Sequence, residues 1–472
     1  MGEAPTSAPR VADSTGHLGA GRAAASIARV SAGSLAVDVA LVSMVALILG
    51  LIRLGTPSFW VDEAFTAWRV DDSFLELVEG YHWLYGTIVK PWAFVAGTSE
   101  EALRLPSVFG AMLAAALLVV LVRKLFDRWA ALASGLFLAT SPFIVKWSQQ
   151  ARAYALLVPV SLIATLLLLR ALERGSSRAA WVAYGLALTA VIVWHPVAGL
   201  VLIPPHAVLF VQRREHVLPH GLLAAVIICA LALPWSGQIF ERSTGGSDGL
   251  ARGWLRAPTP IDAGQTLLDV SGAVGLGLVL AVAGLVILVR AGSSEQALWL
   301  GTWAFAPFVV TLAVSPVRPL YLDRYLITAA PAFALLAGVA VTRVPWRVRT
   351  MAVGAAVVAT SVGLLGWYAS SDRGGNWRGE DWRGAVATVL ARSEESDAIL
   401  VVPWSVRQAA TYYGADVAGT STAESIWVVT WSETGEEMTA ADRHQLGFGD
   451  HELVERIQFG WRVSAQLWRR EQ

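Results

Sequence analysis

Long apolar runs constrain the fold of this chain more than any other sequence feature. A helix that crosses a bilayer needs roughly 20 mainly apolar residues. Runs of about that length lie near residues 34–55, 104–122, 129–146, 154–172, 179–195, 197–212, 219–236, 269–289, 298–315, 325–342 and 350–369. Charged residues make up 15% of the 472 residues, whereas soluble domains contain about 25%. We therefore predict a mainly α-helical, polytopic membrane bundle of about 11 transmembrane helices.

The stretch 179–212 decides the span count, because His195-Pro196 interrupts it either as a kink within one helix or as a loop between two. The first run is not expected to be a cleavable signal, since a long polar segment precedes it and no small-residue cleavage site follows.

The distribution of basic residues predicts the orientation, because Lys and Arg concentrate in short cytoplasmic loops. With the N-terminus inside, the inner segments contain Arg10, Arg22, Arg29, Arg123, Lys124, Arg128, Arg170, Arg174, Arg178, Arg213, Arg214, Arg290, Arg343, Arg347 and Arg349. Every second loop is then basic. We predict a multi-pass protein of the plasma membrane with a cytoplasmic N-terminus and an extracytoplasmic C-terminal region.

Three segments differ in composition from the bundle at 32–370. Residues 1–31 are rich in Ala, Ser, Gly and Arg and are expected to form a disordered cytoplasmic tail. The outer loop 56–103 is long and contains short amphipathic pieces. Residues 371–472 are expected to form a small extracytoplasmic α/β domain. Its predicted strands are AILVVPW, SIWVVTW and RVSAQLW, and its predicted helix is WRGAVATVLARS.

Composition also excludes some functions. The net charge is zero, so no basic field favours nucleic acid. One cysteine, Cys229, allows neither an intramolecular disulfide nor a cysteine-based metal site. The sequence contains no P-loop and no G-x-G-x-x-G motif, so nucleotide-driven chemistry is not expected. No cofactor is required by the sequence; a divalent metal is left open, without a ligand cluster to support it.

Asp62-Glu63 follows the first predicted span directly, at its outer end. A positioned carboxylate can take the proton of a sugar hydroxyl, and a second acid can fix its partner. The alternative is a pair of solvated loop acids or helix caps. From spacing alone the two interpretations are equally supported.

Two arginines are predicted on the same outer side. Arg152 heads the span at 154–172, with Lys146 and Tyr154 nearby, and Arg324 with Tyr325 opens the span at 325–342. A planar guanidinium suits a phosphate because it pairs in a bidentate manner. The alternative is an interfacial arginine that reaches the lipid headgroups.

Two single histidines, His82 and His195, are more often hydrogen-bonded structural residues than ligands.

The order of motifs resembles a known family. The motifs are WVDEAFT (60–66), HWLY (82–85), ALRLPS (102–107), SPF (141–143), SQQARAYAL (148–156), RYLITAAPAFALLAG (324–338) and EDWRG (380–384). This order is similar to that of bacterial family 39-type glycosyltransferases with the GT-C fold. These are relatives of the protein O-mannosyltransferases and of the lipid A aminoarabinose transferase. The resemblance covers most of residues 34–390.

The resemblance implies an inverting transfer of a sugar from a polyprenyl-phosphate donor to a glycan, lipid or protein acceptor outside the membrane. Mannose is the sugar that the family labels suggest. Asp62 would be the general base and Glu63 its helper. Donor phosphate would be held by Arg152 and Arg324, with Lys146 or His82. The expected substrate pocket contains Tyr85, Gln149, Gln150, Tyr154, His195 and Tyr325.

The sequence departs from the family pattern at three places. Gln150 stands where the family usually has an acid, which puts activity or acceptor choice in doubt. HWLY is one residue shorter than the common H-P-P-x-Y pattern, and Gly86 follows Tyr85 where a second Tyr is frequent. The last two departures concern the contribution of the outer loop to the pocket.

Two other classes of function compete with the enzyme. A lipid-linked sugar flippase or transporter usually has paired, inverted halves with helices broken at mid-membrane, and no such symmetry is visible here. A non-catalytic relative would bind glycan through the outer domain. Geometry discriminates between these hypotheses, because a transferase requires Asp62, Arg152 and Arg324 to meet in one outer cavity. The identities of sugar and acceptor and the oligomeric state are left open.

Overall fold

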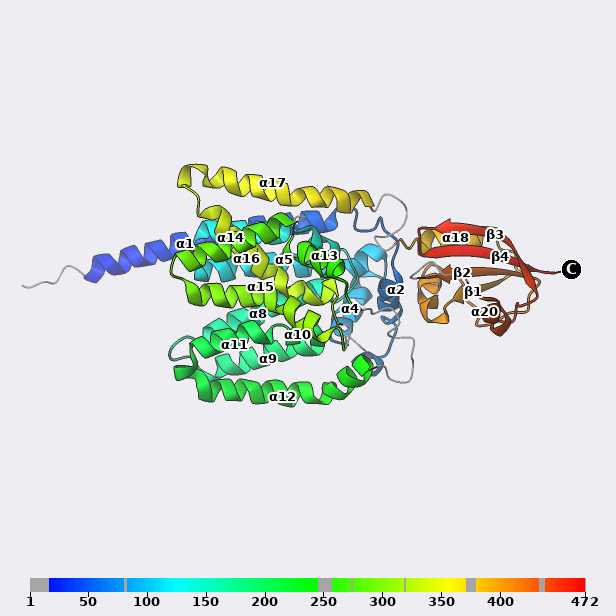
Figure 1. The fold of residues 1–472 in the computed structure, drawn as a ribbon, viewed down its shortest axis with the longest axis horizontal. Helices are drawn as coiled ribbons and strands as arrows, with labels where there is room; N and C mark the ends of the chain where they lie inside the picture. Colours follow the sequence, from blue (N-terminus) through cyan, green and yellow to red (C-terminus); the bar gives the residue numbers. More distant parts are fainter. Residues whose placement is uncertain are drawn as a thin grey trace, which may run out of the picture.

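The computed structural model describes residues 17–79, 83–244, 257–272, 275–317, 320–370, 379–432 and 438–471. These residues form a helical bundle with a small α/β domain at one end (Figure 1). Both parts of the predicted fold class are therefore confirmed.

The helices run in chain order through the bundle and then into the small domain. Their bounds are α1 (His17–Leu51), α2 (Val61–Trp68), α3 (Phe74–Glu79), α4 (Trp83–Ala96), α5 (Glu100–Leu125), α6 (Arg128–Ala139), α7 (Pro142–Ser148), α8 (Tyr154–Ala171), α9 (Arg178–Trp194), α10 (Pro196–Leu200), α11 (Ile203–Gln212), α12 (Arg214–Thr244), α13 (Pro260–Ser271), α14 (Leu276–Arg290), α15 (Ser294–Val314), η3 (Asp323–Ala329), α16 (Ala330–Thr342), α17 (Trp346–Ser370), α18 (Trp382–Arg392), η5 (Trp404–Val406), α19 (Arg407–Tyr412) and α20 (Ala440–Gln445).

Each apolar run predicted from sequence is helical over most of its length, although the run 34–55 extends past the end of α1 and the runs 129–146, 197–212 and 269–289 each cross a break between two helices. Among the described residues, 6 helices are long and apolar enough to cross a membrane, or up to 8 if each of two bent pairs is one span. One bent pair is α6 with α7, which meet at 56°, and the other is α13 with α14. Three further apolar helices are shorter. The chain is thus a multi-pass membrane protein, and the total of about 11 spans stays a prediction.

The break at His195-Pro196 is a chain reversal rather than a kink. Helix α9 ends at Trp194, and His195 caps α10 by accepting a hydrogen bond from the Ala198 amide on Nδ1 (3.2 Å). Helix α10 then packs back against α9. A Cβ at Gly199 would lie 2.5 Å from the Ile192 Cα. Only glycine therefore permits this close approach.

Helix α16 forms the centre of the bundle, because every residue from Ala330 to Thr342 is buried. It packs against α6 and α14. Small residues make the close contacts: a Cβ at Gly284 of α14 would lie 2.2 Å from the Leu336 carbonyl oxygen. In a bilayer, where the hydrophobic effect does not drive helices together, such close packing is what holds them.

The first helix is joined to the bundle by an ion pair. Asp38 is buried on α1 and accepts two hydrogen bonds of 2.9 Å from the Arg128 guanidinium at the start of α6. Helix α1 begins at His17, within the segment expected to be a disordered tail. Residues 1–16 of that segment lie outside the described residues.

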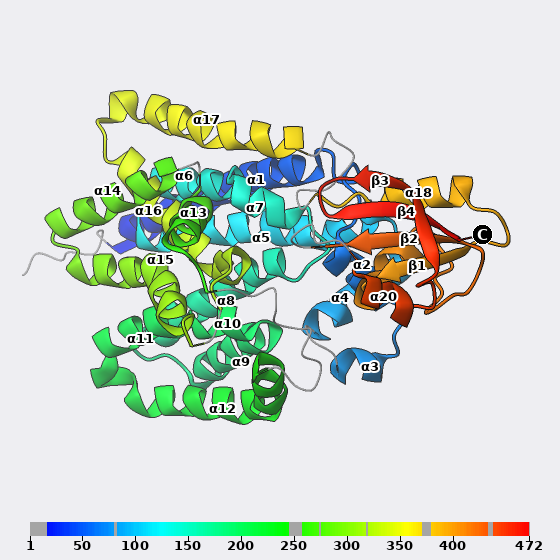
Figure 2. The ribbon, with the colours of Figure 1, turned by 45° about the vertical axis from the view of Figure 1, so that its right-hand side comes forward.

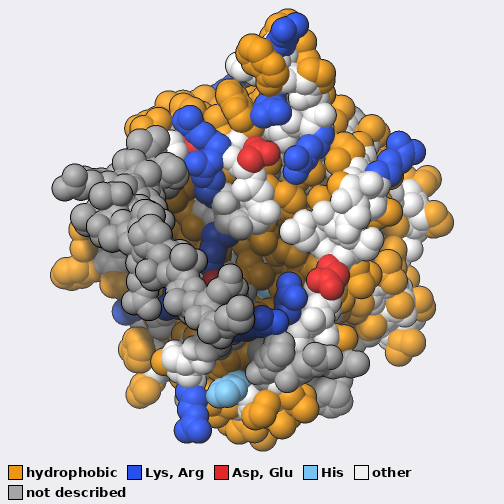
Figure 3. Space-filling model, turned by 90° about the vertical axis from the view of Figure 1, so that its left-hand side faces the viewer, with side chains coloured by type: hydrophobic (Ala, Val, Ile, Leu, Met, Phe, Trp, Pro, Cys, Tyr) orange, Lys and Arg blue, Asp and Glu red, His pale blue; other side chains and the backbone are white. Residues whose placement is uncertain are grey.

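The two ends of the bundle differ in charge. The loops predicted to be cytoplasmic lie at the end opposite the α/β domain, where α5 ends with Arg123 and Lys124, α8 with Arg170 and α14 with Arg290. Figure 3 shows Lys and Arg side chains spread over this face, with few Asp and Glu. The α/β domain and the outer helix α2 share the other end (Figure 2).

The C-terminal domain contains a sheet of order β1-β2-β4-β3 in the described residues. Its strands are β1 (Ala398–Val402), β2 (Ser425–Trp431), β3 (His451–Phe459) and β4 (Val463–Arg470). β1 and β2 are parallel, whereas β2, β4 and β3 pair antiparallel. The three predicted strands and the predicted helix α18 are confirmed. Strand β3 was not predicted from the sequence, since its residues after His451 are exposed or half-exposed and mix charged with apolar side chains.

Candidate active site

A cavity of about 270 Å³ lies at the end of the bundle that carries the C-terminal domain. It is lined by helices α2, α3, α4 and α8, the loop after α2, the turn before α8, and η3. Its wall contains Asp62, Phe65, Thr66, Arg69, Val70, Leu77, Tyr85, Gly86, Val89, Lys90, Arg152, Tyr154, Arg324 and Tyr325. The expected convergence of Asp62, Arg152 and Arg324 on one cavity is thus observed.

Asp62 stands in the first turn of α2 and is the carboxylate that lines this cavity. Its side chain is 37% exposed, and Oδ2 lies 3.5 Å from Nη2 of Arg152. This separation is longer than the 2.7–2.9 Å typical of charge-assisted hydrogen bonds. Asp62 is therefore held near a cation but keeps an accessible oxygen.

Arg152 is fixed by the backbone rather than by the carboxylate. Its Nη1 donates to the main-chain oxygen of Asp62 (3.0 Å) and to Thr66 Oγ1 (3.4 Å). Burial by itself lowers the pKa of Arg152, but the attraction of Asp62 and the neighbouring tyrosines outweighs it, so the pKa lies above its ordinary value. Arg152 consequently stays cationic in the cavity.

Arg324 enters the cavity from η3, the short helix that precedes α16. It is 4% exposed, and its guanidinium lies over the rings of Tyr154 (5.9 Å) and Tyr325 (5.6 Å). His195 stands behind these rings, 4.5 Å from Tyr325 between centroids, and does not line the cavity. The aromatic rings thus support a second cation in the same space as Arg152.

Glu63 does not face the cavity, so the sequence grouped two residues that the fold separates. Glu63 is fully buried, and its oxygens accept from Nε and Nη2 of Arg104, each at 2.8 Å. Oε1 also accepts from the amide of Ala151 (2.7 Å). Successive residues of a helix point about 100° apart, which sends Asp62 to the cavity and Glu63 to the core.

Arg104, in the motif ALRLPS, was not among the residues predicted for the site, although it is the partner of Glu63. Its other N–H groups donate to the carbonyl oxygens of Leu54 (2.7 Å), Pro57 (2.9 Å) and Ser58 (3.4 Å). All five N–H groups of this guanidinium therefore have acceptors. A buried arginine inside a predicted span was the available signal.

Two other expected pocket residues bind protein groups outside the cavity wall. Gln149 donates to the carbonyl oxygens of Gly50 (3.1 Å) and Ile52 (2.7 Å), and its Oε1 accepts from the Trp367 indole (2.7 Å). Gln150 accepts from the Trp60 indole (2.6 Å). Because both amides are engaged in joining helices, neither faces the substrate space.

Lys146 is also engaged elsewhere. Its Nζ lies 3.0 Å from Oδ2 of Asp323, and it does not line the cavity. His82, the remaining expected phosphate ligand, lies outside the described residues.

Two cations in the cavity wall were not expected from the sequence. Arg69 pairs with Asp72 (2.9 Å), and Lys90 donates to the carbonyl oxygens of Val70 (2.6 Å) and Asp72 (2.7 Å). Lys90 therefore holds the loop after α2 against α4, whereas Arg69 joins the same loop to α3 through the carbonyl oxygens of Glu76 and Leu77 (both 3.2 Å). Their separation in sequence gave no signal that they meet.

Tyr85 and Gly86 form part of the wall contributed by α4. Burial raises the pKa of Tyr85, so the phenol is neutral at pH 7. A Cβ at Gly86 would lie 3.0 Å from Leu77 Cδ2. The departure from the family pattern at Gly86 thus leaves room between α3 and α4.

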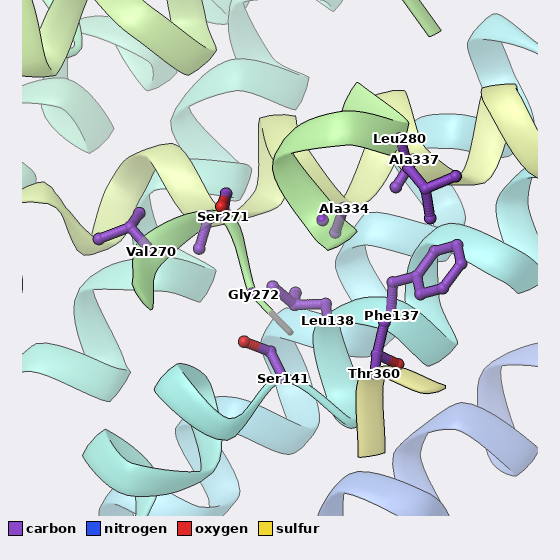
Figure 4. A pocket seen from close by; sticks show the side chains of 12 residues that line it. Phe137, Leu138, Ser141, Val270, Ser271, Gly272, Leu280, Ala334, Ala337 and Thr360 are labelled. Atoms are coloured by element: carbon purple, nitrogen blue, oxygen red, sulfur yellow. The ribbon is translucent and has the colours of Figure 1, made fainter. Parts of the chain in front are cut away.

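A second cavity, of about 20 Å³, lies deeper in the bundle between α6, α13, α14, α16 and α17 (Figure 4). Its polar side chains are Ser141, Ser271 and Thr360, and the rest of its wall is apolar or glycine. It contains no charged group, so it does not suit an anionic substrate. Among the described residues, no group of three or more His, Cys, Asp or Glu is placed to hold a metal ion.

Comparison with known proteins places the fold. Residues 84–237 match the family described as dolichyl-phosphate-mannose-protein mannosyltransferase. None of the curated proteins compared with the chain matches it.

Solved structures match over most of the chain. ArnT from Cupriavidus metallidurans matches in its form bound to undecaprenyl phosphate, with a TM-score of 0.60, 16% identity, and coverage of 91% of this chain and 97% of that one. The apo form of ArnT matches with a TM-score of 0.63, 16% identity, and coverage of 93% and 98%. The apo oligosaccharyltransferase of Archaeoglobus fulgidus matches with a TM-score of 0.51, 13% identity, and coverage of 85% and 70%.

These likenesses define a membrane protein with the GT-C glycosyltransferase fold. Within that class, residues 84–237 resemble the dolichyl-phosphate-mannose-protein mannosyltransferase family, and the chain shares its fold with ArnT over most of its length, in line with the resemblance of its motifs.

Proposed function

We propose that this protein is a membrane glycosyltransferase that moves a sugar from a polyprenyl-phosphate donor to an acceptor outside the cytoplasm. One observation carries the proposal: Asp62, Arg152 and Arg324, from three separate segments, line a single cavity. A carboxylate beside two buried cations combines a proton acceptor with an anion site. The likeness to an ArnT structure bound to undecaprenyl phosphate supports this class of donor.

In this proposal Arg152 and Arg324 bind the phosphate of the donor. The phosphate is the leaving group and gains charge as its bond to the sugar breaks, so fixed cations stabilise the transition state more than the ground state. Nη1 of Arg152 is occupied by Asp62 O and Thr66, whereas Nη2 lies 3.5 Å from the Asp62 carboxylate, which places the proposed phosphate ligand beside the proposed base.

Asp62 is the proposed general base. It takes the proton of the acceptor hydroxyl as that oxygen attacks the anomeric carbon of the sugar. A new carbon–oxygen bond forms on one face while the bond to the phosphate oxygen breaks on the other. The products are the glycosylated acceptor, with inverted configuration, the lipid phosphate and a protonated Asp62. Glu63 supports the site indirectly, because its ion pair with Arg104 fixes the helix that carries Asp62.

The proposed orientation places the basic face in the cytoplasm and the cavity outside. The positive-inside tendency of membrane proteins supports it. The proposed division of the chain follows: a membrane domain over 32–370, with the loop 56–103 at the cavity, and an extracytoplasmic domain over 371–472. Mannose is the proposed sugar, supported by the family that residues 84–237 match.

The test is a panel of polyprenyl-phosphate sugars incubated with the purified full chain, with donor consumption and product configuration followed by mass spectrometry and NMR. We expect one sugar, with mannose as the first choice, to be consumed in the presence of a glycan, lipid or peptide acceptor and to yield an inverted product. No consumption of any donor would overturn the proposal. Movement of intact donor across a vesicle membrane would instead favour a flippase, and glycan binding without turnover would favour a non-catalytic relative.

A further inference from the structure

The helix that carries Asp62 has no cap of its own. Helix α2 spans Val61–Trp68, and Trp60 at its N-cap makes no side-chain capping hydrogen bond. The Trp60 indole donates to Gln150 Oε1 instead. A helix of 8 residues is too short to be stable alone. Something outside its own sequence must therefore hold its first turn.

The cap comes from the C-terminal domain. Glu380 lies 319 positions away in sequence, and its Oε2 accepts from the amide of Val61, the first residue of α2 (3.0 Å). A carboxylate at a helix N-terminus also interacts favourably with the helix dipole. Asp62 is the next residue, so this contact fixes the backbone immediately before it.

Glu380 is itself held rigidly. It is fully buried, its Oε2 also accepts from the Trp382 indole (3.0 Å), and its Oε1 lies 3.8 Å from Nη1 of Arg462. Trp382 is fully buried at the start of α18, and Arg462 follows β3. The Glu380 carboxylate is thus fixed relative to the rest of the α/β domain.

The residues before α2 are attached to the same domain. The amide of Phe59 donates to the Tyr413 hydroxyl (2.7 Å), and Ser58 Oγ accepts from the amide of Arg383 (3.3 Å). Glu100 at the start of α5 contacts both Tyr413 and Arg383. Every residue from 58 to 61 therefore has a fixed backbone or side-chain contact before the chain reaches Asp62.

We propose that Glu380 is a positioning residue, through which the C-terminal domain sets the direction of the Asp62 carboxylate. The inference rests on the proposed function and adds a role for the motif EDWRG. Glu380 does not line the cavity. Its effect passes through Val61 to Asp62 and governs the proton transfer rather than donor binding.

The test compares Glu380→Ala and Glu380→Gln in the full chain. The matched control is Glu455→Gln, which removes an exposed ion pair with Arg392 in the same domain, away from α2. Small displacements of a catalytic group cost about 100-fold in rate. We expect Glu380→Ala to lower kcat about 100-fold with donor KM unchanged. Glu380→Gln, whose amide oxygen still accepts from Val61, should recover at least about tenfold of that loss.

A double substitution shows whether Glu380 acts through Asp62. In the Asp62→Asn background, Glu380→Ala should produce no further loss, because the group that it positions is already absent. Independent losses that multiply would overturn the proposal. A normal kcat for Glu380→Ala, or a higher donor KM with normal kcat, would also overturn it.

Hydrogen exchange supplies a readout besides activity. Glu380→Ala should speed exchange in a peptide covering 58–66 and leave the strands of the sheet unchanged, whereas Glu455→Gln should change neither. If Glu380→Ala does not fold, Glu380→Gln decides by its kcat and exchange. The two proposals fail differently: inactive wild-type protein overturns the proposed function, whereas active wild-type protein with unaltered Glu380→Ala kinetics overturns this inference alone.

Discussion

The cavity and the buried ion pair of Glu63 with Arg104, which we call the anchor, contain the adjacent residues Asp62 and Glu63. Their charged groups are paired to different degrees. In the cavity, Asp62 is partly exposed and lies 3.5 Å from Arg152. In the anchor, Glu63 and Arg104 are almost completely buried, with two contacts of 2.8 Å between them. The anchor saturates its hydrogen-bonding groups, whereas the cavity leaves a carboxylate oxygen accessible.

The difference teaches how an exposed base can be held accurately. A buried ion pair is costly to form and stabilises only when its geometry and further hydrogen bonds are good. Glu63 and Arg104 meet that condition, since they also bind Ala151 and three carbonyl oxygens. Rigid contacts on one side of α2 thus permit a weakly paired carboxylate on the other.

The largest expected effect on activity distinguishes Asp62 from its neighbour Glu63. Asp62→Asn removes the proposed base at nearly constant shape, so transfer should fall about 10²- to 10⁴-fold while the Tm stays unchanged. The measurement is product formation with saturating donor, alongside thermal unfolding. Asp71→Asn, an exposed acid close by in the same loop, is the matched control and should keep full activity. Unaltered product formation by Asp62→Asn would contradict its role.

Glu63→Gln should instead lower the Tm, and activity should fall only as the protein unfolds. It leaves the buried Arg104 without its counter-ion, and breaking such a pair costs about 3–5 kcal/mol. We expect a much lower Tm, with loss of activity that follows unfolding rather than preceding it. The check is to measure both properties over the same temperature range. A folded, inactive Glu63→Gln protein with a normal Tm would instead place Glu63 in the chemistry.

Substitution of either cavity arginine should impair donor use more than substitution of Lys146. Arg152→Ala or Arg324→Ala removes a charged contact to the donor phosphate worth about 1.5–3 kcal/mol. The value of kcat/KM for the donor should therefore fall about 10- to 100-fold. Lys146→Ala should leave donor KM unchanged, because Lys146 pairs with Asp323 outside the cavity wall. Equal losses in all three variants would show that Lys146 also reaches the donor.

The smallest expected effect concerns the contact between the domains. Tyr413→Phe removes a hydroxyl that accepts from the Phe59 amide and also contacts Ser58 Oγ (3.3 Å) and Glu100 Oε1. The Phe59 amide has a second acceptor, Glu100 Oε1 (3.2 Å). Because one acceptor remains, we expect a loss of about 1 kcal/mol in stability and a modest fall in kcat. Tyr412→Phe is the matched control, since its hydroxyl bonds only to the Thr98 carbonyl at the surface among its described contacts (2.9 Å). A larger loss from Tyr412→Phe would reverse the assignment.

Much of the fold was predictable because membrane helices and buried strands leave local signals. Apolar length identified the helices, and alternation or short apolar runs identified β1, β2 and β4. Strand β3 was missed because its exposed side chains, such as Glu452 and Glu455, hide that pattern. The reversal at His195 needed the contact between Gly199 and Ile192, which no local pattern contains.

The site was predictable in part. Asp62, Arg152 and Arg324 were selected because ionisable groups at a membrane edge are costly and therefore informative. Lys146 was selected because it lies near Arg152 in sequence, and Gln149 and Gln150 because they belong to the motif that carries the family resemblance, although their side chains bind protein groups elsewhere. Nearness along the chain identifies a segment, but side-chain direction decides which members reach the cavity.

The sequence by itself determined a polytopic helical bundle, a small α/β domain and one end where acids and arginines gather. Only the tertiary structure decided that Asp62 faces the cavity while Glu63 faces Arg104, and that Glu380 caps α2 from 319 positions away. The physical reason is the range of the interactions. Hydrophobicity and helix period act over a few neighbours, whereas the partners of a charge are chosen by packing between segments that are distant along the chain.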